Sequence, residues 1–310
     1  MQVYAILFFV PFFWLPLSML ARLRSSRLGF TALLLFMAAG GCYMAVDRWQ
    51  RETIFSVELG ESRWWREPPA GIEIYDVSLS NGEHVRTWYL RHSDEAAPTV
   101  LYLHGSRWNL NGSVFRIERW ADMGYSVLAI DYRGFGESSP RLPSQDSVVD
   151  DAAAALQELA RRQPDPARRF IYGHSLGGAV AAVLAAKPGQ PDFAGLILES
   201  TFTNIRDMIH TTRWADIPGL AILVTQPFDT EAALKDLRQP VLILHGTNDQ
   251  VVPHAMSDTL LKAASHPNVP LRRLVKFEGA SHSGVSRNGQ LYSTTVRDFM
   301  RDVGARSAAF

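Results

Sequence analysis

A series of short aliphatic or β-branched runs, each bounded by turns or helical patterns, constrains the fold more than any other feature of this sequence. The first two runs flank Asn81-Gly82, a pair that is a strong β-hairpin signal. Most later runs are apolar along their whole length, as buried strands of a parallel sheet are. The sequence therefore predicts an α/β fold with a mostly parallel, doubly wound sheet that opens antiparallel. The runs are 72–78, 84–90, 99–103, 125–130, 170–172, 196–198, 241–244 and 271–277.

Helical patterns separate these runs, and the clearest covers residues 148–162. Its apolar residues recur at the spacing of one helix face, and Pro164 ends the pattern. Ser147, with Asp150 three residues later, resembles the start of a capping box. In such folds ligands bind at the carboxyl ends of the strands. We therefore expect the chemistry to lie in the loops that directly follow the apolar runs.

A glycine-rich turn follows the run 170–172 and carries the candidate nucleophile, Ser175. The turn reads Gly173-His174-Ser175-Leu176-Gly177-Gly178 and leads into an apolar helical stretch. A serine on a sharp strand-to-helix turn needs small neighbours, because the strained backbone and the close helix leave no room for side chains. The start of the helix also directs unpaired N–H groups at a developing negative charge.

Two later strand-end loops supply candidate partners for this serine, Asp249 and His282. A free serine is a poor nucleophile at neutral pH and needs an imidazole that a carboxylate holds in the right tautomer. The order Ser, Asp, His is the one that a nucleophile of this turn type requires. The sequence therefore predicts Ser175 as nucleophile, His282 as general base and Asp249 as the carboxylate that orients the histidine.

From about residue 72 to the C-terminus, the chain resembles the α/β-hydrolase superfamily. Besides the serine turn, His104-Gly105-Ser106 resembles the family's His-Gly-x turn, although the membrane-bound group named below often has Asn at x. This resemblance implies that the backbone N–H groups of Ser106 and Leu176 form an oxyanion hole. Residues 246–253 resemble the family's acid loop. The loop 131–138 resembles one that is usually structural, so Asp131 and Arg133 are expected to brace loops rather than bind substrate.

The apolar N-terminus and the short insertion before residue 241 resemble a membrane-bound group of that superfamily. This group includes protein depalmitoylases and uncharacterised bacterial members. The implied activity is hydrolysis of an acyl ester or thioester of a small molecule or lipid, through an acyl-enzyme. Serine in this turn argues against dehalogenase or epoxide-hydrolase chemistry, which uses an aspartate there. A serine peptidase of the aminopeptidase kind is the alternative, and a membrane-tethered binding protein with an inactive triad fits an intact triad poorly.

Composition argues against several other classes of function. Lys plus Arg and Asp plus Glu both number 31, so the net charge of zero creates no field that would attract nucleic acid. The single cysteine, Cys42, excludes an intramolecular disulfide and a thiolate cluster. No pair of histidines has metal-ligand spacing on a helix, and the turn at Gly173 lacks the lysine of a nucleotide loop. We expect no metal, no cofactor and no obligate protein partner.

Residues 1–50 are predicted to anchor the chain in a membrane. Residues 1–21 and 28–46 are two uncharged, apolar runs, separated by Arg22, Arg24 and Arg27. A span takes about 20 apolar residues. Two spans joined by an arginine-rich loop would keep that loop in the cytoplasm. The catalytic domain would then be extracytoplasmic, on the periplasmic side in a bacterium.

Two other interpretations of the N-terminus remain open. Translation from Met19 would give one span, or a lipoprotein signal with Cys42 as the lipidated residue. Alternatively, the apolar runs are core helices of a soluble protein.

Residues 51–310 should form the catalytic domain, with a short lid segment at about 201–239. The stretch between the runs that end at 198 and begin at 241 is too short for a large cap domain. Its apolar residues could wall an acyl chain, or form an amphipathic helix that covers the sheet. They are Ile205, Met208, Ile209, Trp214, Ile217, Leu220, Ile222, Leu223 and Val224.

Overall fold

The computed structural model describes residues 27–57, 64–212, 214–265 and 269–307. The chain divides into two compact units, Met1–Trp49 and Gln50–Phe310. The first predicted span, residues 1–21, lies outside the described residues.

A long apolar helix, α3 (Arg27–Ile54), precedes the sheet in the chain. Its stretch from Gly29 to Ile54 is long and apolar enough to cross a membrane, and signal sequences share this length and composition. Most of its large apolar side chains between residues 30 and 44 are exposed. These are Phe30, Leu34, Leu35, Phe36, Met37, Tyr43 and Met44.

The second unit is built on an eight-stranded sheet in the order β1-β2-β4-β3-β5-β6-β7-β8. β1 pairs with β2, and β2 with β4, in antiparallel fashion, and every later pair is parallel. The predicted mostly parallel sheet with an antiparallel opening is confirmed. The strands are β1 (Glu73–Ser78), β2 (His84–Leu90), β3 (Thr99–Leu103), β4 (Ser126–Ile130), β5 (Arg169–His174), β6 (Gly195–Glu199), β7 (Val241–Gly246) and β8 (Arg272–Phe277).

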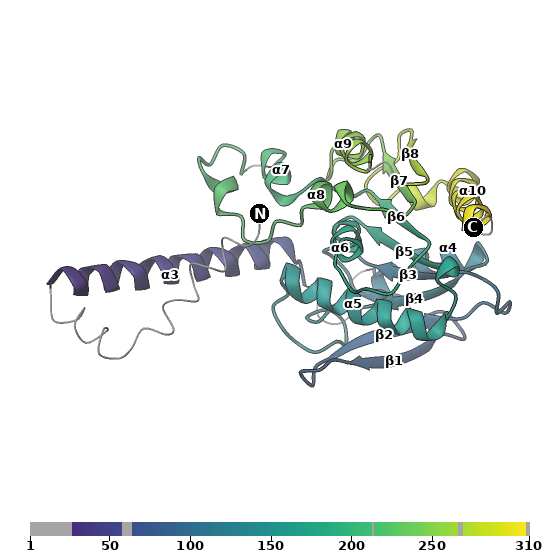
Figure 1. The fold of residues 1–310 in the computed structure, drawn as a ribbon, viewed down its shortest axis with the longest axis horizontal. Helices are drawn as coiled ribbons and strands as arrows, with labels where there is room; N and C mark the ends of the chain where they lie inside the picture. The colour runs from purple at the N-terminus through teal and green to yellow at the C-terminus, as the bar shows by residue number, and fades with distance from the viewer. Residues whose placement is uncertain (1–26, 58–63, 213, 266–268, 308–310) are drawn as a thin grey trace. The chain divides into compact units, whose positions relative to one another are not determined.

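Helices cover both faces of this sheet (Figure 1). Residues of α5, α6, α8 and α9 share one buried cluster, and those of α4 and α10 share the other. The helices are α4 (Leu110–Asp122), α5 (Gln145–Arg162), α6 (Leu176–Ala185), α7 (Ile205–His210), α8 (Thr230–Lys235), α9 (Ala255–Ala263) and α10 (Gly289–Ser307). Short 3-10 turns are η1 (Pro166–Arg168), η2 (Leu220–Leu223) and η3 (Val285–Arg287).

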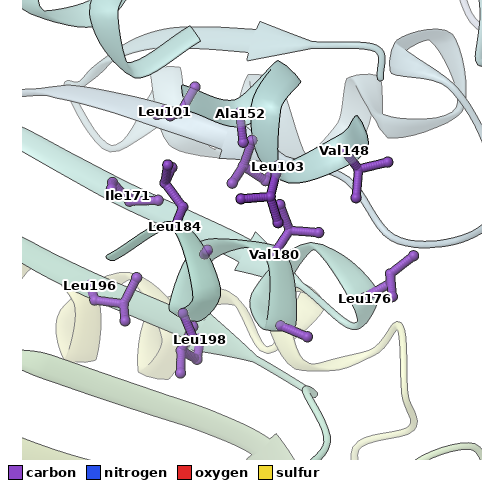
Figure 2. Packing of buried hydrophobic residues seen from close by; sticks show 14 of the residues in the cluster. Leu101, Leu103, Val148, Ala152, Ile171, Leu176, Val180, Leu184, Leu196 and Leu198 are labelled. Carbon is purple, nitrogen blue, oxygen red and sulfur yellow. The ribbon is translucent and has the colours of Figure 1, made fainter. Parts of the chain in front are cut away.

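The two cores follow from the alternation of side chains along each strand. In β3, Leu101 and Leu103 pack against α5 and α6, whereas Val100 and Tyr102 belong to the opposite cluster. Figure 2 shows the first core, in which leucines of neighbouring strands meet Val180 and other α6 side chains. Because both faces are covered, these strands are apolar throughout, which is the pattern that the sequence displays.

The start of α5 differs from the prediction. The helix begins at Gln145, and Ser144 is its N-cap, whose hydroxyl accepts a hydrogen bond from the Ser147 N–H at 3.2 Å. The Ser147 hydroxyl in turn accepts from the Ser144 N–H at 2.9 Å. The predicted capping box of Ser147 and Asp150 is therefore wrong, because Ser147 is already inside the helix. Asp150 instead lies 2.7 Å from the ammonium of Lys187.

The predicted lid segment, residues 201–239, carries α7, η2 and α8. Ile205 and Met208 pack against the first core, as the covering-helix interpretation expects. Ile217, Ile222 and Leu223, in contrast, are 45%, 83% and 54% exposed.

Candidate active site

The register of the three central strands brings their carboxyl ends together. Gly173 of β5 pairs with Leu103 of β3 on one side and with Leu198 of β6 on the other. The loops that follow these strands therefore meet at one edge of the sheet. Ser175 lies in the middle one of the three.

Ser175 occupies a strained backbone position between β5 and α6. Its φ of 55° and ψ of −121° lie in a region that residues other than glycine rarely adopt. The surroundings hold this conformation, because its N–H donates to the carbonyl oxygen of Glu199 at 2.9 Å and its own carbonyl accepts from the Thr201 hydroxyl at 2.8 Å. The turn thus presents the serine side chain at the start of α6.

The glycines around Ser175 are required by close backbone contacts. A Cβ on Gly173 would lie 2.1 Å from the carbonyl oxygen of Gly177. A Cβ on Gly177 would lie 2.2 Å from that of Leu103 and 2.5 Å from that of His104. The expectation that this turn excludes side chains at both positions is confirmed.

The three predicted triad residues lie in one hydrogen-bonded chain. His282 Nε2 is 3.0 Å from Ser175 Oγ, and His282 Nδ1 is 2.8 Å from Asp249 Oδ2. The Asp249 carboxylate is fully buried, whereas the His282 side chain keeps 16% exposure. This is the arrangement in which an imidazole can withdraw a proton from a hydroxyl while a carboxylate fixes its tautomer.

The Asp249 carboxylate is held by more groups than His282. Its Oδ1 accepts from the N–H groups of Val251 and Val252, both at 2.8 Å. Its Oδ2 lies 3.2 Å from His245 Nε2. Burial favours the neutral acid, but the hydrogen bonds from His245 and His282 outweigh this effect and hold the pKa of Asp249 well below its usual range. No pattern in the sequence marks His245, because its role depends on this contact.

The loop after β3 lies directly against the serine. A Cβ on Gly105 would be 3.4 Å from the Cβ of Ser175, and Ser106 lines the same cavity as Ser175. Leu176 is the first residue of α6, where a backbone N–H has no partner within the helix. Both residues of the expected oxyanion hole are therefore adjacent to the nucleophile.

A cavity of about 440 Å³ opens over these residues. None of the described residues of segment 201–239 lines it. The hypothesis that this segment walls the acyl site is therefore wrong for this cavity, whose walls come from the strand-end loops, α4 and the end of α3. The lining residues are Thr53, Ile54, Ser56, Tyr102, Gly105, Ser106, Arg107, Trp108, Ser113, Arg116, His174, Ser175, Asn248, Gln250, Val251, Ser281, His282 and Ser283.

A buried polar cluster that the sequence did not predict lies beside the triad. Arg116 of α4 is 1% exposed, and its Nη2 lies 3.1 Å from His174 Nε2. Its Nε lies 3.8 Å from Glu199, which accepts a hydrogen bond from the Tyr172 hydroxyl at 2.8 Å. Burial, and then the charge of Arg116, hold the pKa of His174 well below its usual value, so the ring is neutral at physiological pH. No pattern marked Arg116, since it is a charged residue among the buried positions of an amphipathic helix.

Asp131 and Arg133 brace loops, as expected, but not through a mutual ion pair. Arg133 pairs with Glu83 and binds Asp151, with 2.5 Å between Arg133 Nε and the carboxylate. Asp131 accepts a hydrogen bond from the Leu110 N–H at 2.8 Å, where α4 begins. Neither residue lines the cavity. Among the described residues, no three His, Cys, Asp or Glu side chains converge as a metal site would require.

Comparison with known proteins places this geometry in a family. Residues 94–228 match a family model described as serine aminopeptidase, S33. The alpha/beta hydrolase domain-containing protein WAV2 of Arabidopsis thaliana is 30% identical over 290 residues, which cover 86% of this chain and 93% of the relative. This chain is an α/β-hydrolase.

Two further similarities bear on this α/β-hydrolase. Lysophosphatidylserine lipase ABHD12 of Danio rerio is 30% identical over 259 residues, 76% of this chain and 65% of the relative. An esterase from Pyrococcus furiosus has the same fold, with a TM-score of 0.60 and 17% identity over 78% of this chain and 98% of the esterase. The expected superfamily and fold are confirmed, and family membership supports an enzyme.

Proposed function

We propose that this α/β-hydrolase cleaves acyl esters or thioesters through an acyl-enzyme on Ser175. The observation that carries the proposal is the chain of contacts from Ser175 Oγ through His282 to Asp249, at 3.0 Å and 2.8 Å. A hydroxyl becomes a competent nucleophile when a base accepts its proton during attack.

In the proposed mechanism His282 takes the Ser175 proton as the hydroxyl oxygen bonds to the acyl carbon. Asp249 stabilises the imidazolium, and the N–H groups of Ser106 and Leu176 bind the oxyanion. The imidazolium then returns the proton to the departing alcohol or thiol. Water, activated by the same imidazole, hydrolyses the acyl-enzyme and releases the acid.

An aminopeptidase is the competing function, since the matching family model bears that description. An aminopeptidase has to bind the free α-ammonium group of its substrate, and a carboxylate is the natural partner for it. The side chains that line this cavity include two arginines and, among the described residues, no carboxylate. Guanidinium groups repel an ammonium, so the cavity favours ester or thioester substrates.

The proposed substrates are lipids or other acyl compounds at a membrane. Two observations support this: the relative named as a lysophosphatidylserine lipase, and the apolar exposed helix α3. We propose that α3 anchors the chain with its catalytic domain outside the cytoplasm, because Arg22 and Arg24 precede it and Arg27 is its first residue. A long-chain thioester, as in the depalmitoylase-like group, belongs to the same proposal.

The test is activity profiling of the full chain, purified in detergent. A fluorophosphonate probe should label the wild type and the control Ser293→Ala, which alters a serine of α10 outside the cavity, but not Ser175→Ala. For a series of acyl esters, kcat/KM should rise with chain length, by about 0.8 kcal/mol of binding free energy for each buried methylene, until the cavity is filled. Labelling of Ser175→Ala, or faster cleavage of aminoacyl amides than of esters, would refute the proposal.

A further inference from the structure

The fully charged side chains described in the wall of the cavity over Ser175 are all positive. Among the described residues that line it, and besides His174 and His282, the side chains that carry a full charge at neutral pH are Arg107 and Arg116. Serine hydroxyls and the amides of Asn248 and Gln250 account for much of the remaining wall. The part of the wall that carries the arginines suits a negatively charged part of a substrate, whereas Ile54, Trp108 and Val251 supply apolar surface in the same cavity.

Arg116 is incompletely paired inside the protein. Its Nε is buried without a hydrogen-bond acceptor, and the facing oxygen of Glu199, Oε1, is also without a donor, the two being 3.8 Å apart. A buried guanidinium whose hydrogen bonds are unmade is costly. Nε of Arg116 faces Glu199, so an anion in the cavity would meet the other side of the guanidinium, since Arg116 also lines the cavity.

Arg116 lies on the side of Ser175 where His282, the proposed general base, is located. Arg116 Nη2 and the carbonyl oxygen of His282 both lie 3.1 Å from the same atom, His174 Nε2. Arg116 is therefore next to the backbone of the general base. In an acyl transfer of this kind the general base later protonates the leaving group, so the leaving group lies on the histidine side of the serine.

Arg107 is an exposed counterpart at the same cavity. It follows Ser106 in the loop after β3, and its guanidinium has no carboxylate within ion-pairing distance among the described residues. An exposed arginine at the cavity mouth attracts anions from solution, whereas a buried one binds them more strongly.

We propose that Arg107 and Arg116 form a subsite for an anionic group, a phosphate or a carboxylate, on the leaving group of the substrate. The proposal rests on the proposed serine-hydrolase function and narrows its substrate class to acyl esters of anionic alcohols. Guanidinium groups bind the oxygens of either anion in pairs, and the hydroxyls of Ser281 and Ser283 lie in the same wall.

The test compares matched esters that share one octanoyl chain and differ only in the alcohol. The alcohols are glycerol, glycerol 3-phosphate and glyceric acid, which are neutral, phosphate-bearing and carboxylate-bearing. For the full chain in detergent, kcat/KM should be at least tenfold higher for one anionic ester than for the neutral ester. Which of the two is preferred identifies the anion, and added salt should reduce the preference.

Variants assign the preference to the two arginines. Arg107→Gln and Arg116→Gln should each lower the ratio of anionic to neutral kcat/KM about tenfold, mainly through KM for the anionic ester. Arg168→Gln, which alters an exposed arginine paired with Asp165, is the matched control and should keep the wild-type ratio. If Arg116→Gln does not fold, the ratio of anionic to neutral kcat/KM in Arg107→Gln, a change at an exposed residue, tests the subsite.

Fluorophosphonate labelling of Ser175 separates the two proposals. A wild-type protein that is labelled but cleaves neutral and anionic esters equally well would overturn the anionic subsite and leave the serine mechanism intact. An unchanged ratio in Arg107→Gln would likewise overturn the subsite. Absence of labelling in the wild type would refute the serine mechanism itself.

Discussion

At the scale of single residues, Asp249 connects the backbone of its own loop to two histidine side chains of the site. One carboxylate oxygen accepts two backbone N–H groups of its own loop, and the other faces the imidazoles of His282 and His245. The hydrogen bonds keep this acid ionised far into the acidic range. An acid limb in the pH–rate profile would therefore not arise from titration of Asp249.

Replacing either partner of Ser175 should abolish most turnover. We expect His282→Ala to lower kcat on the order of 10⁴-fold or more, and Asp249→Asn somewhat less, because the oxyanion hole survives in both. Asp258→Asn, a surface carboxylate paired with Lys276, is the control and should retain wild-type kcat. Full activity of Asp249→Asn in steady-state assays would mean that another group orients the histidine.

Asp131 should make stability depend on pH. Burial raises the pKa of this carboxyl from 3.8 to about 7, although the Leu110 N–H partly opposes the shift. Because the folded state binds this proton more tightly, the contribution of Asp131 to the free energy of unfolding should fall as pH rises from about 4 to about 7 and level off above, by a few kcal/mol at most. Burial lowers the pKa of His104, 3.5 Å away, to about 4, so His104 contributes in the opposite direction. Asp131→Asn should remove the Asp131 contribution, and the exposed Asp150→Asn should not. Parallel stability curves for wild type and Asp131→Asn in chemical denaturation would contradict the assignment.

At the scale of elements, the serine turn depends on how closely α6 approaches β3. The first turn of α6 lies against the carbonyl oxygens of Leu103 and His104, and only a hydrogen fits at Gly177. The same approach places the N-terminus of α6 beside the loop that carries Ser106. The packing of α6 and the geometry of the expected oxyanion hole therefore depend on the same contacts.

Gly177→Ala should damage stability and activity together. A Cβ placed 2.2 Å from a backbone oxygen has to displace α6 or β3, at a cost of about 1–3 kcal/mol or more, and kcat should fall as the oxyanion hole widens. Gly304→Ala in α10 is the matched control, since nothing lies within 4 Å of its Cβ. That change should be neutral or raise stability by up to about 1 kcal/mol. Thermal unfolding of the two variants distinguishes these outcomes, and equal melting temperatures would contradict the packing argument.

The strands and the residues of the candidate triad could be predicted from the sequence because their signals are local. Buried parallel strands carry continuous apolar runs, and Ser175 and Asp249 each follow such a strand. His282 follows β8, which is partly exposed and carries Arg272, Arg273 and Lys276. The start of α5 was misplaced because Ser144 and Ser147 are both good caps, and only the backbone decides between them. Arg116 and His245 could not be found, since their roles depend on contacts between elements far apart in the chain.

At the scale of the whole molecule, the chain combines the unit that carries the candidate site with an apolar helix that contains Cys42, an exposed cysteine. A reporter enzyme fused after residue 310 should be active only outside the cytoplasm, because positive charge before α3 favours the cytoplasmic side. Activity of the fusion only in the cytoplasm would refute this orientation. Loss of membrane attachment in Cys42→Ala would favour a lipid anchor, and retention would favour anchoring by the helix itself.

The order of elements along the chain has a consequence for biosynthesis. α3 is made before any strand, whereas the strand at the far edge of the sheet, β8, is made almost last. At about 5–20 residues per second, roughly ten seconds or more separate the two on the ribosome. Through that interval the apolar helix has left or is leaving the exit tunnel while the sheet is unfinished. The apolar helix is therefore available to targeting machinery before the α/β-hydrolase domain has folded.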